Sequence, residues 1–114
     1  MAYPDDKLNQ AHTKLSKEFP NLKFKSVATD LSKVDGKYME DLKEGIRGIE
    51  DEIGIVFNNA GYIRFGEFDK SPIEEHLKHI ECNSLSHIRI THYFYQKMKE
   101  KKRGLICFTS SSVS

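Results

Sequence analysis

The spacing of apolar side chains in the first third of the chain predicts a helix followed by a strand. Apolar residues recur every three or four positions from Leu8 to Phe19, which is the period of an amphipathic helix, and Pro20 interrupts the pattern. Residues 22–28 alternate apolar and polar side chains, as a strand with one buried face does. We therefore expect a helix up to residue 19 and a short strand that enters a loop at residues 29–32.

The middle of the chain changes from a helical period to a continuous apolar run. Between Val34 and Ile49 the apolar side chains fall on one helical stripe, with lysines and glutamates on the opposite side. Residues 53–57 read Ile-Gly-Ile-Val-Phe, and an apolar run without alternation favours a strand buried on both faces. These segments predict a helix at 34–49 and a central parallel strand at 53–57.

The last third predicts one long helix and one further strand. A serine, a proline and a glutamate at residues 71–74 form an N-terminal capping pattern, and basic residues at 97–103 suit the end of a helix. Asn83 and Ser84 interrupt the apolar stripe, which predicts a kink there. Residues 105–109 are again apolar and predict a buried strand that leads into a run of serines.

Strands that alternate with helices predict a parallel α/β sheet, here a three-layer α/β fold. We find no repeat and no low-complexity linker between these segments, so residues 1–114 are expected to form one domain or part of one.

Composition narrows the classes of function. Lysine and arginine number 18 against 17 aspartates and glutamates, and the two signs are interspersed, which argues against a nucleic-acid or acidic-membrane partner. No apolar run approaches the roughly 20 residues of a membrane-spanning helix. Cys82 and Cys107 have no disulfide-framework spacing, so we expect thiols in a reducing environment, and the sequence indicates no location beyond that.

Polar signatures follow each predicted strand, where ligands of open parallel sheets bind. Asp30 follows the first strand, Asn-Asn-Ala-Gly at residues 58–61 follows the second, and Ser110 and Ser111 follow the third. In this order and spacing, together with Asn83 in the long helix, the chain resembles an internal piece of a short-chain dehydrogenase/reductase. Within that family it looks most similar to the hydroxysteroid and ketoacyl-lipid reductase branch.

The resemblance implies a Rossmann-type sheet that binds NAD or NADP and an enzyme that interconverts a ketone and a secondary alcohol. The implied substrate is a small carbonyl or alcohol compound, lipid-like in the branch named above. Its implied cofactor-binding residues are Asp30, Leu31, Asn58, Asn59, Ala60 and Gly61. Ser111 corresponds to the family's catalytic serine, and Asn83 to the asparagine that holds a water of the proton relay. Neither NAD nor NADP is favoured, because the strand end that sets this preference is not recognisable.

The same resemblance implies that the sheet is incomplete. The family's Gly-rich turn, its first and second strands, its C-terminal strands and its Tyr-x-x-x-Lys are not recognisable here. With the family strand order 3-2-1-4-5, the third strand would lie about 14 Å from the fourth. We therefore expect the isolated chain to be inactive, and a homo-oligomer is plausible.

Two other classes of function stay open at this point. The chain could be a non-catalytic α/β remnant that acts by oligomerisation through unpaired strand edges. It could also derive from another Rossmann-type enzyme, such as a methyltransferase.

Two smaller features have alternative interpretations. His76, His79 and Cys82 share one helix face but have no evident fourth metal ligand, so no metal site is predicted. Tyr62, Phe65 and Phe68 would line a pocket or pack the loop against the sheet, and the sequence does not separate these options.

Overall fold

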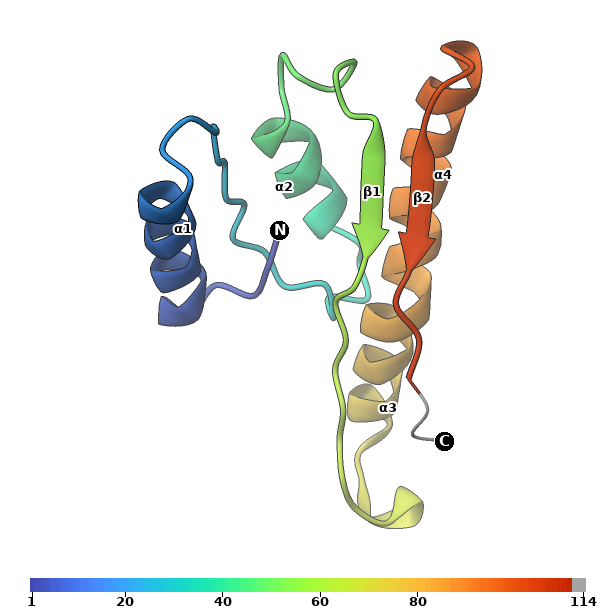
Figure 1. The fold of residues 1–114 in the computed structure, drawn as a ribbon. Helices are drawn as coiled ribbons and strands as arrows, with labels where there is room; N and C mark the ends of the chain where they lie inside the picture. The colour runs from blue at the N-terminus through green and yellow to red at the C-terminus, as the bar shows by residue number, and fades with distance from the viewer. Residues whose placement is uncertain (112–114) are drawn as a thin grey trace.

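Two parallel strands and the helix that crosses between them form the best-packed part of the chain (Figure 1). The computed structural model describes residues 1–111. In chain order its elements are α1 (Asp6–Glu18), α2 (Tyr38–Gly45), β1 (Ile55–Asn58), the 3-10 turn η1 (Phe68–Lys70), α3 (Ile73–Ile80), the π-helical turn η2 (Glu81–Leu85), α4 (Ser86–Glu100) and β2 (Leu105–Phe108). Strands alternate with helices in this order, so the predicted parallel α/β class is confirmed.

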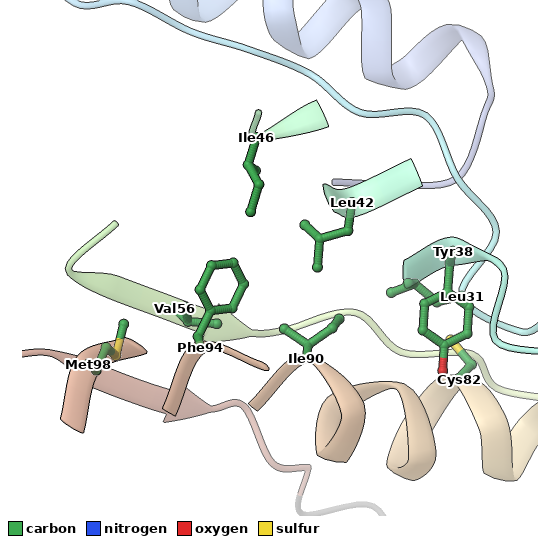
Figure 2. Close-up of a cluster of buried hydrophobic side chains, with 9 residues drawn as sticks. All are labelled: Leu31, Tyr38, Leu42, Ile46, Val56, Cys82, Ile90, Phe94 and Met98. Carbon is green, nitrogen blue, oxygen red and sulfur yellow. The ribbon is translucent and has the colours of Figure 1, made fainter. Parts of the chain in front are cut away.

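The hydrophobic core lies between the β1–β2 pair and the helices α2 and α4. β1 and β2 pair in parallel, with Ile55 opposite Leu105 and Asn58 opposite Phe108. Figure 2 shows Val56 of β1 close to Phe94 of α4. The buried cluster consists of Leu31, Tyr38, Leu42, Ile46, Val56, Cys82, Ile90, Phe94 and Met98.

Only one face of β1 is covered within residues 1–111. Val56 and Asn58 are buried, whereas Ile55 and Phe57, on the other face, are 56% and 69% exposed. The expectation that this strand is buried on both faces is therefore wrong for the described chain, because no helix packs on the outer face. The strand is also displaced toward Asn58 relative to the predicted 53–57. Among residues 1–111 the sheet has two strands, as the predicted incompleteness of the sheet requires.

The first predicted helix is confirmed as α1. Asp5 caps it, because its Oδ1 accepts hydrogen bonds from the amides of Lys7 at 3.0 Å and Leu8 at 3.2 Å. No residue of α1 is buried. Figure 1 shows α1 standing apart from the paired strands.

The strand predicted at residues 22–28 is wrong. Its only ladder contact among the described residues is one parallel bridge between Ala2 and Ala28. Around it the Ala2 amide donates to the Val27 carbonyl at 3.1 Å, and the Thr29 amide donates to the Ala2 carbonyl at 2.9 Å. A strand needs a neighbouring ladder along its length, and this segment has one for a single residue.

The helix predicted at 34–49 forms only as α2, and residues 46–52 are turns. Gly45 ends α2 where residues 22–28 approach closely, because a Cβ at Gly45 would lie 2.2 Å from Cγ2 of Val27. Gly48 adopts a φ of +84°, which glycine tolerates best. These two glycines end the helix before the apolar stripe ends.

The long predicted helix is confirmed, with a change of helix type at the predicted interruption. The turn η2 contains Asn83 and Ser84 and lies between α3 and α4. The Ser86 amide donates to the Glu81 carbonyl, five residues earlier, and the Ser86 hydroxyl donates to the Cys82 carbonyl at 2.8 Å. π-Helical turns of this kind occur often at functional sites.

Candidate functional site

A groove of about 870 Å³ lies beside the carboxyl end of β1. Its walls come from residues 1–3 and 29–32, from α2 and β1, from residues 59–62 after β1, and from side chains of α3, η2 and α4. All six residues proposed for cofactor binding line it, namely Asp30, Leu31, Asn58, Asn59, Ala60 and Gly61. The structure therefore brings together two segments that are about 30 residues apart in the sequence.

The first wall is a tight turn at Asp30. Oδ1 of Asp30 accepts hydrogen bonds from the Ser32 amide at 2.9 Å and the Ser32 hydroxyl at 2.7 Å. Leu31 is buried in the core beneath this turn. Thr29, also buried, donates its hydroxyl to Oδ2 of Asp41 at 2.5 Å, which ties the turn to α2. The Asp30 carboxylate is thus held at the groove by its own turn and by the packing of its neighbours.

The second wall is residues 58–61, which are the last residue of β1 and the three residues that follow it. Asn58 is buried, and its Nδ2 donates to the hydroxyl of Thr91 on α4 at 3.1 Å. His87 of α4 lies 3.0 Å from the Ala60 carbonyl through Nε2, and a carbonyl only accepts, so Nε2 carries the hydrogen. These bonds fix the backbone of the wall from the helix side.

Asn83 lies behind this wall and braces its end. Its Oδ1 accepts from the Tyr62 amide at 2.7 Å, and its Nδ2 donates to the Tyr62 carbonyl at 2.7 Å. This two-point bond holds the backbone immediately after Gly61. Asn83 does not itself line the groove, and its proposed role in binding a water stays a prediction.

Ser111 lies beyond the carboxyl end of β2, at the same edge of the sheet. Thr109 fixes this exit, because its amide donates to the Asn58 carbonyl at 2.9 Å and its hydroxyl donates to Oδ1 of Asn59 at 2.8 Å. Ser111 follows two residues later and is exposed. It is not part of the groove lining, so the structure places it near the second wall and outside the groove.

A charged clamp made by Glu75 with Tyr62, Arg64 and Lys78 contributes three of its four residues, all but Arg64, to the groove lining. Glu75 of α3 accepts hydrogen bonds from the Tyr62 hydroxyl at 3.1 Å, from Arg64 at 3.1 Å and from Lys78 at 2.8 Å. The Lys78 hydrogen bond, followed by the Tyr62 hydrogen bond, lowers the pKa of Glu75, and Glu75 in turn raises the pKa of Lys78. The clamp fixes the loop after Gly61 on α3.

The histidines considered as metal ligands and the aromatic residues of the loop after Gly61 do not form sites of their own among the described residues. His76 contacts the Phe68 carbonyl through Nε2 at 3.0 Å and stacks on the Phe68 ring, whereas His79 meets the edge of the Tyr62 ring. Within residues 1–111 no group of three or more histidine, cysteine or acidic side chains is placed to hold a metal. Phe65 and Phe68 are both exposed, while Tyr62 lines the groove, so the three aromatic residues do not act as one set.

Both cysteines are thiols in the structure. Cys82 is buried, Cys107 is half-buried, and both are free. Burial, and then the charge of Asp30, raises the pKa of the Cys82 thiol.

In the described part of the chain no helix combines the length and the apolar character needed to cross a bilayer.

Sequence reasoning missed the residues that hold the walls from behind. His87, Thr91 and Thr109 bond to the wall but carry no motif of their own. His87 follows Asn83 by four positions, one helical turn, which is the one local signal that could have identified it.

The comparisons with known proteins agree with this architecture. A solved structure from work on 7beta-hydroxysteroid dehydrogenase stereoselectivity superposes with a TM-score of 0.81 at 20% identity, covering 95% of this chain and 41% of that one. This likeness shows a Rossmann-type fold.

Two curated relatives are similar in sequence. The chain is 30% identical over 102 residues to a very-long-chain 3-oxoacyl-CoA reductase of Coccidioides immitis (strain RS), covering 88% of this chain and 29% of that protein. It is 26% identical over 110 residues to the uncharacterized oxidoreductase YvaG of Bacillus subtilis (strain 168), covering 96% of this chain and 39% of that protein. The chain thus spans less than half the length of these relatives.

The sequence model of the family described as short chain dehydrogenase matches residues 1–114, the whole chain. This match agrees with the resemblance and leaves the methyltransferase alternative without support. The chain belongs to the short-chain dehydrogenase family.

Proposed function

We propose that this chain is a segment of an NAD(P)-dependent oxidoreductase that interconverts a ketone and a secondary alcohol, and that it supplies the adenosine side of the cofactor site. One observation carries the proposal. The six residues that the family resemblance assigns to the cofactor line a single groove, although they come from two separate segments. The isolated chain is proposed to be inactive in hydride transfer.

The groove suits the adenosine part of a dinucleotide. Its lining is largely apolar and contains two carboxylates, Asp30 and Glu75. Glu75 is engaged by Tyr62, Arg64 and Lys78, whereas Asp30 can accept from an exocyclic amine while its Oδ1 keeps the Ser32 bonds. At Gly61 only Asn83 Oδ1, at 3.8 Å, would meet an added Cβ, so the backbone there leaves room for a ribose. Asp30, Leu31 and residues 58–61 would hold this half of the cofactor.

The proposed reaction assigns two further positions. When bound, the nicotinamide ring supplies or accepts the hydride. Ser111 would donate its hydroxyl hydrogen bond to the substrate oxygen as negative charge develops there. Asn83 would position the groove wall and the water of the proton relay. A lipid-like substrate, as in the 3-oxoacyl-CoA reductase relatives, is the proposed class within the family.

Adenosine tests the proposed site directly, because it is the part of the cofactor that these residues would bind. We expect millimolar adenosine to shift the backbone NMR signals of residues 30–32 and 58–61 and to leave those of α1 unchanged. Asp30→Ala should weaken this binding about fivefold or more, the effect of losing one charge-assisted hydrogen bond. Asp35→Ala is the matched control, because Asp35 lies outside the groove.

Two results would contradict the proposal. One is the absence of shifts in both walls, and the other is an equal loss of binding in the Asp35 control. The second candidate function, association through the uncovered sheet face, rests on the exposure of Ile55, Phe57 and Leu105. It would replace the first if adenosine fails to bind while sedimentation shows a dimer that Phe57→Ser disrupts.

A further inference from the structure

Three side chains from three elements meet outside the groove, two of them fully buried and the third, Arg89, partly exposed. Tyr38 begins α2, Glu81 begins the π-helical turn η2, and Arg89 lies on α4. The Tyr38 hydroxyl donates to Oε1 of Glu81, and Nη1 of Arg89 lies 3.1 Å from the same oxygen. The Arg89 guanidinium also lies 5.9 Å from the centre of the Tyr38 ring. Figure 2 shows Tyr38 reaching from α2 toward the helix that carries Cys82.

The orientation of the Glu81 carboxylate depends on these two partners. Both Tyr38 and Glu81 are 0% exposed. Among the described residues, Oε2 of Glu81 is buried and has no hydrogen-bond partner. A buried carboxylate with one unmatched oxygen is costly, and stability alone does not favour keeping it there. A role in fixing the position of its own helical turn accounts for it better.

The π-helical turn connects this cluster to both walls of the groove. Asn83 lies two residues after Glu81 in the same turn and makes the two-point bond to the backbone of Tyr62. On the other side, Tyr38 packs in the same buried cluster as Leu31, which belongs to the Asp30 wall. The turn η2 is therefore linked by contacts to both segments that the groove brings together.

We propose that Glu81 is a positioning residue, which acts through Asn83 to hold the wall after Gly61 at a fixed distance from the Asp30 wall. Tyr38 and Arg89 orient the Glu81 carboxylate and so fix the π-helical turn. The turn presents the Asn83 amide to Tyr62. The consequence for cofactor binding rests on the proposed function. The coupling, meaning the effect of the Tyr38 side chain on the hydrogen bond between the Tyr62 amide and Asn83, does not.

The coupling is measured by hydrogen exchange of the Tyr62 amide, which donates to Asn83, in the 114-residue chain. The Phe94 amide inside α4 reports overall stability. We expect Tyr38→Phe to speed Tyr62 exchange about fivefold more than Phe94 exchange, as expected for the loss of one buried hydrogen bond. Tyr95→Phe is the matched control, because Tyr95 is exposed on α4, and it should leave the ratio of the two rates unchanged.

A double variant tests whether the effect passes through Asn83. Asn83→Ala alone should release the Tyr62 amide, and adding Tyr38→Phe should then produce no further change in the ratio. Glu81→Gln keeps the shape of the side chain but removes the charge that pairs with Arg89, and it provides a second route to the same result if Tyr38→Phe lowers overall stability. Equal acceleration at Tyr62 and Phe94 in both variants, or additive effects in the double variant, would overturn the proposal. This readout uses no ligand, so failure of adenosine to bind would contradict the proposed function alone.

Discussion

The N-terminal third and the rest of this chain both carry helix and strand patterns, but these patterns lead to different structures. Residues 22–28 alternate like a strand and form one bridge, whereas residues 55–58 and 105–108 pair along their whole length. Helix α1 buries no side chain, but α4 buries five, Ser86, His87, Ile90, Phe94 and Met98. The difference teaches that a strand pattern becomes a strand only where a neighbouring ladder satisfies its backbone.

The largest expected effect comes from removing a core side chain of the well-packed region. Phe94 is 3% exposed and lies between β1 and α2 (Figure 2). Phe94→Ala should lower the free energy of unfolding by about 3–5 kcal/mol, because it leaves a cavity among buried neighbours. Urea unfolding followed by circular dichroism measures the change.

Phe19→Ala at the end of α1 is the matched control. Phe19 is 44% exposed, so its loss should cost less than about 1 kcal/mol. Equal costs for the two substitutions would break the comparison, since they would mean that α1 is packed as firmly as α4.

The sequence predicted the first and last helices well, and predicted poorly the extent of the helix at 34–49, the extent of the strands and their burial. Leu8 to Phe19 and the long C-terminal stripe have the helical period, and helix hydrogen bonds are local, so both helices form as expected. The pattern in residues 22–28 says nothing about which strand lies beside it. In the same way, the apolar run at 53–57 cannot show that one face of β1 has no covering helix within residues 1–111.

The residues of the candidate site also fall into those that the sequence could identify and those that it could not. Asp30 and Asn58 could be identified from the sequence, because each follows a predicted strand where such sheets place their ligands. The residues that hold the two groove walls in place could not be identified from the sequence, because their partners are distant in sequence. His87 reaches the Ala60 carbonyl across 27 residues, and Tyr38 reaches Glu81 across 43. Only the fold creates those contacts.

A smaller effect is expected from acid pH, which should loosen one loop of the well-packed region through protonation of Glu75. Hydrogen bonds from Lys78 and Tyr62 hold the pKa of Glu75 below its ordinary value of 4.5. A carboxyl whose pKa is lower in the folded state stabilises that state above its unfolded pKa, and this contribution is lost as pH falls through the folded value. We expect the loop at residues 62–71 to loosen below about pH 4.5, with the Tyr62 and Arg64 signals moving together in an NMR titration.

Glu75→Gln should remove this acid transition while the remainder of the chain keeps its own pH response. Glu74→Gln is the control, because Glu74 is exposed on the same helix and lies outside the clamp. A transition at Tyr62 and Arg64 that survives in Glu75→Gln would show that another acid holds the loop.

The smallest expected effect comes from α1. Leu15 is one of its most regularly placed apolar residues, yet it is 39% exposed, and the helix buries no side chain. A side-chain hydrogen bond between Nδ1 of His12 and the Ser26 hydroxyl, at 3.2 Å, joins α1 to residues 22–28. Leu15→Ala should therefore change the free energy of unfolding by less than about 0.5 kcal/mol, since alanine also favours the helix. A loss above about 2 kcal/mol in urea unfolding would show that the apolar stripe of α1 is covered in solution, so that both regions of the chain would owe their helices to packing.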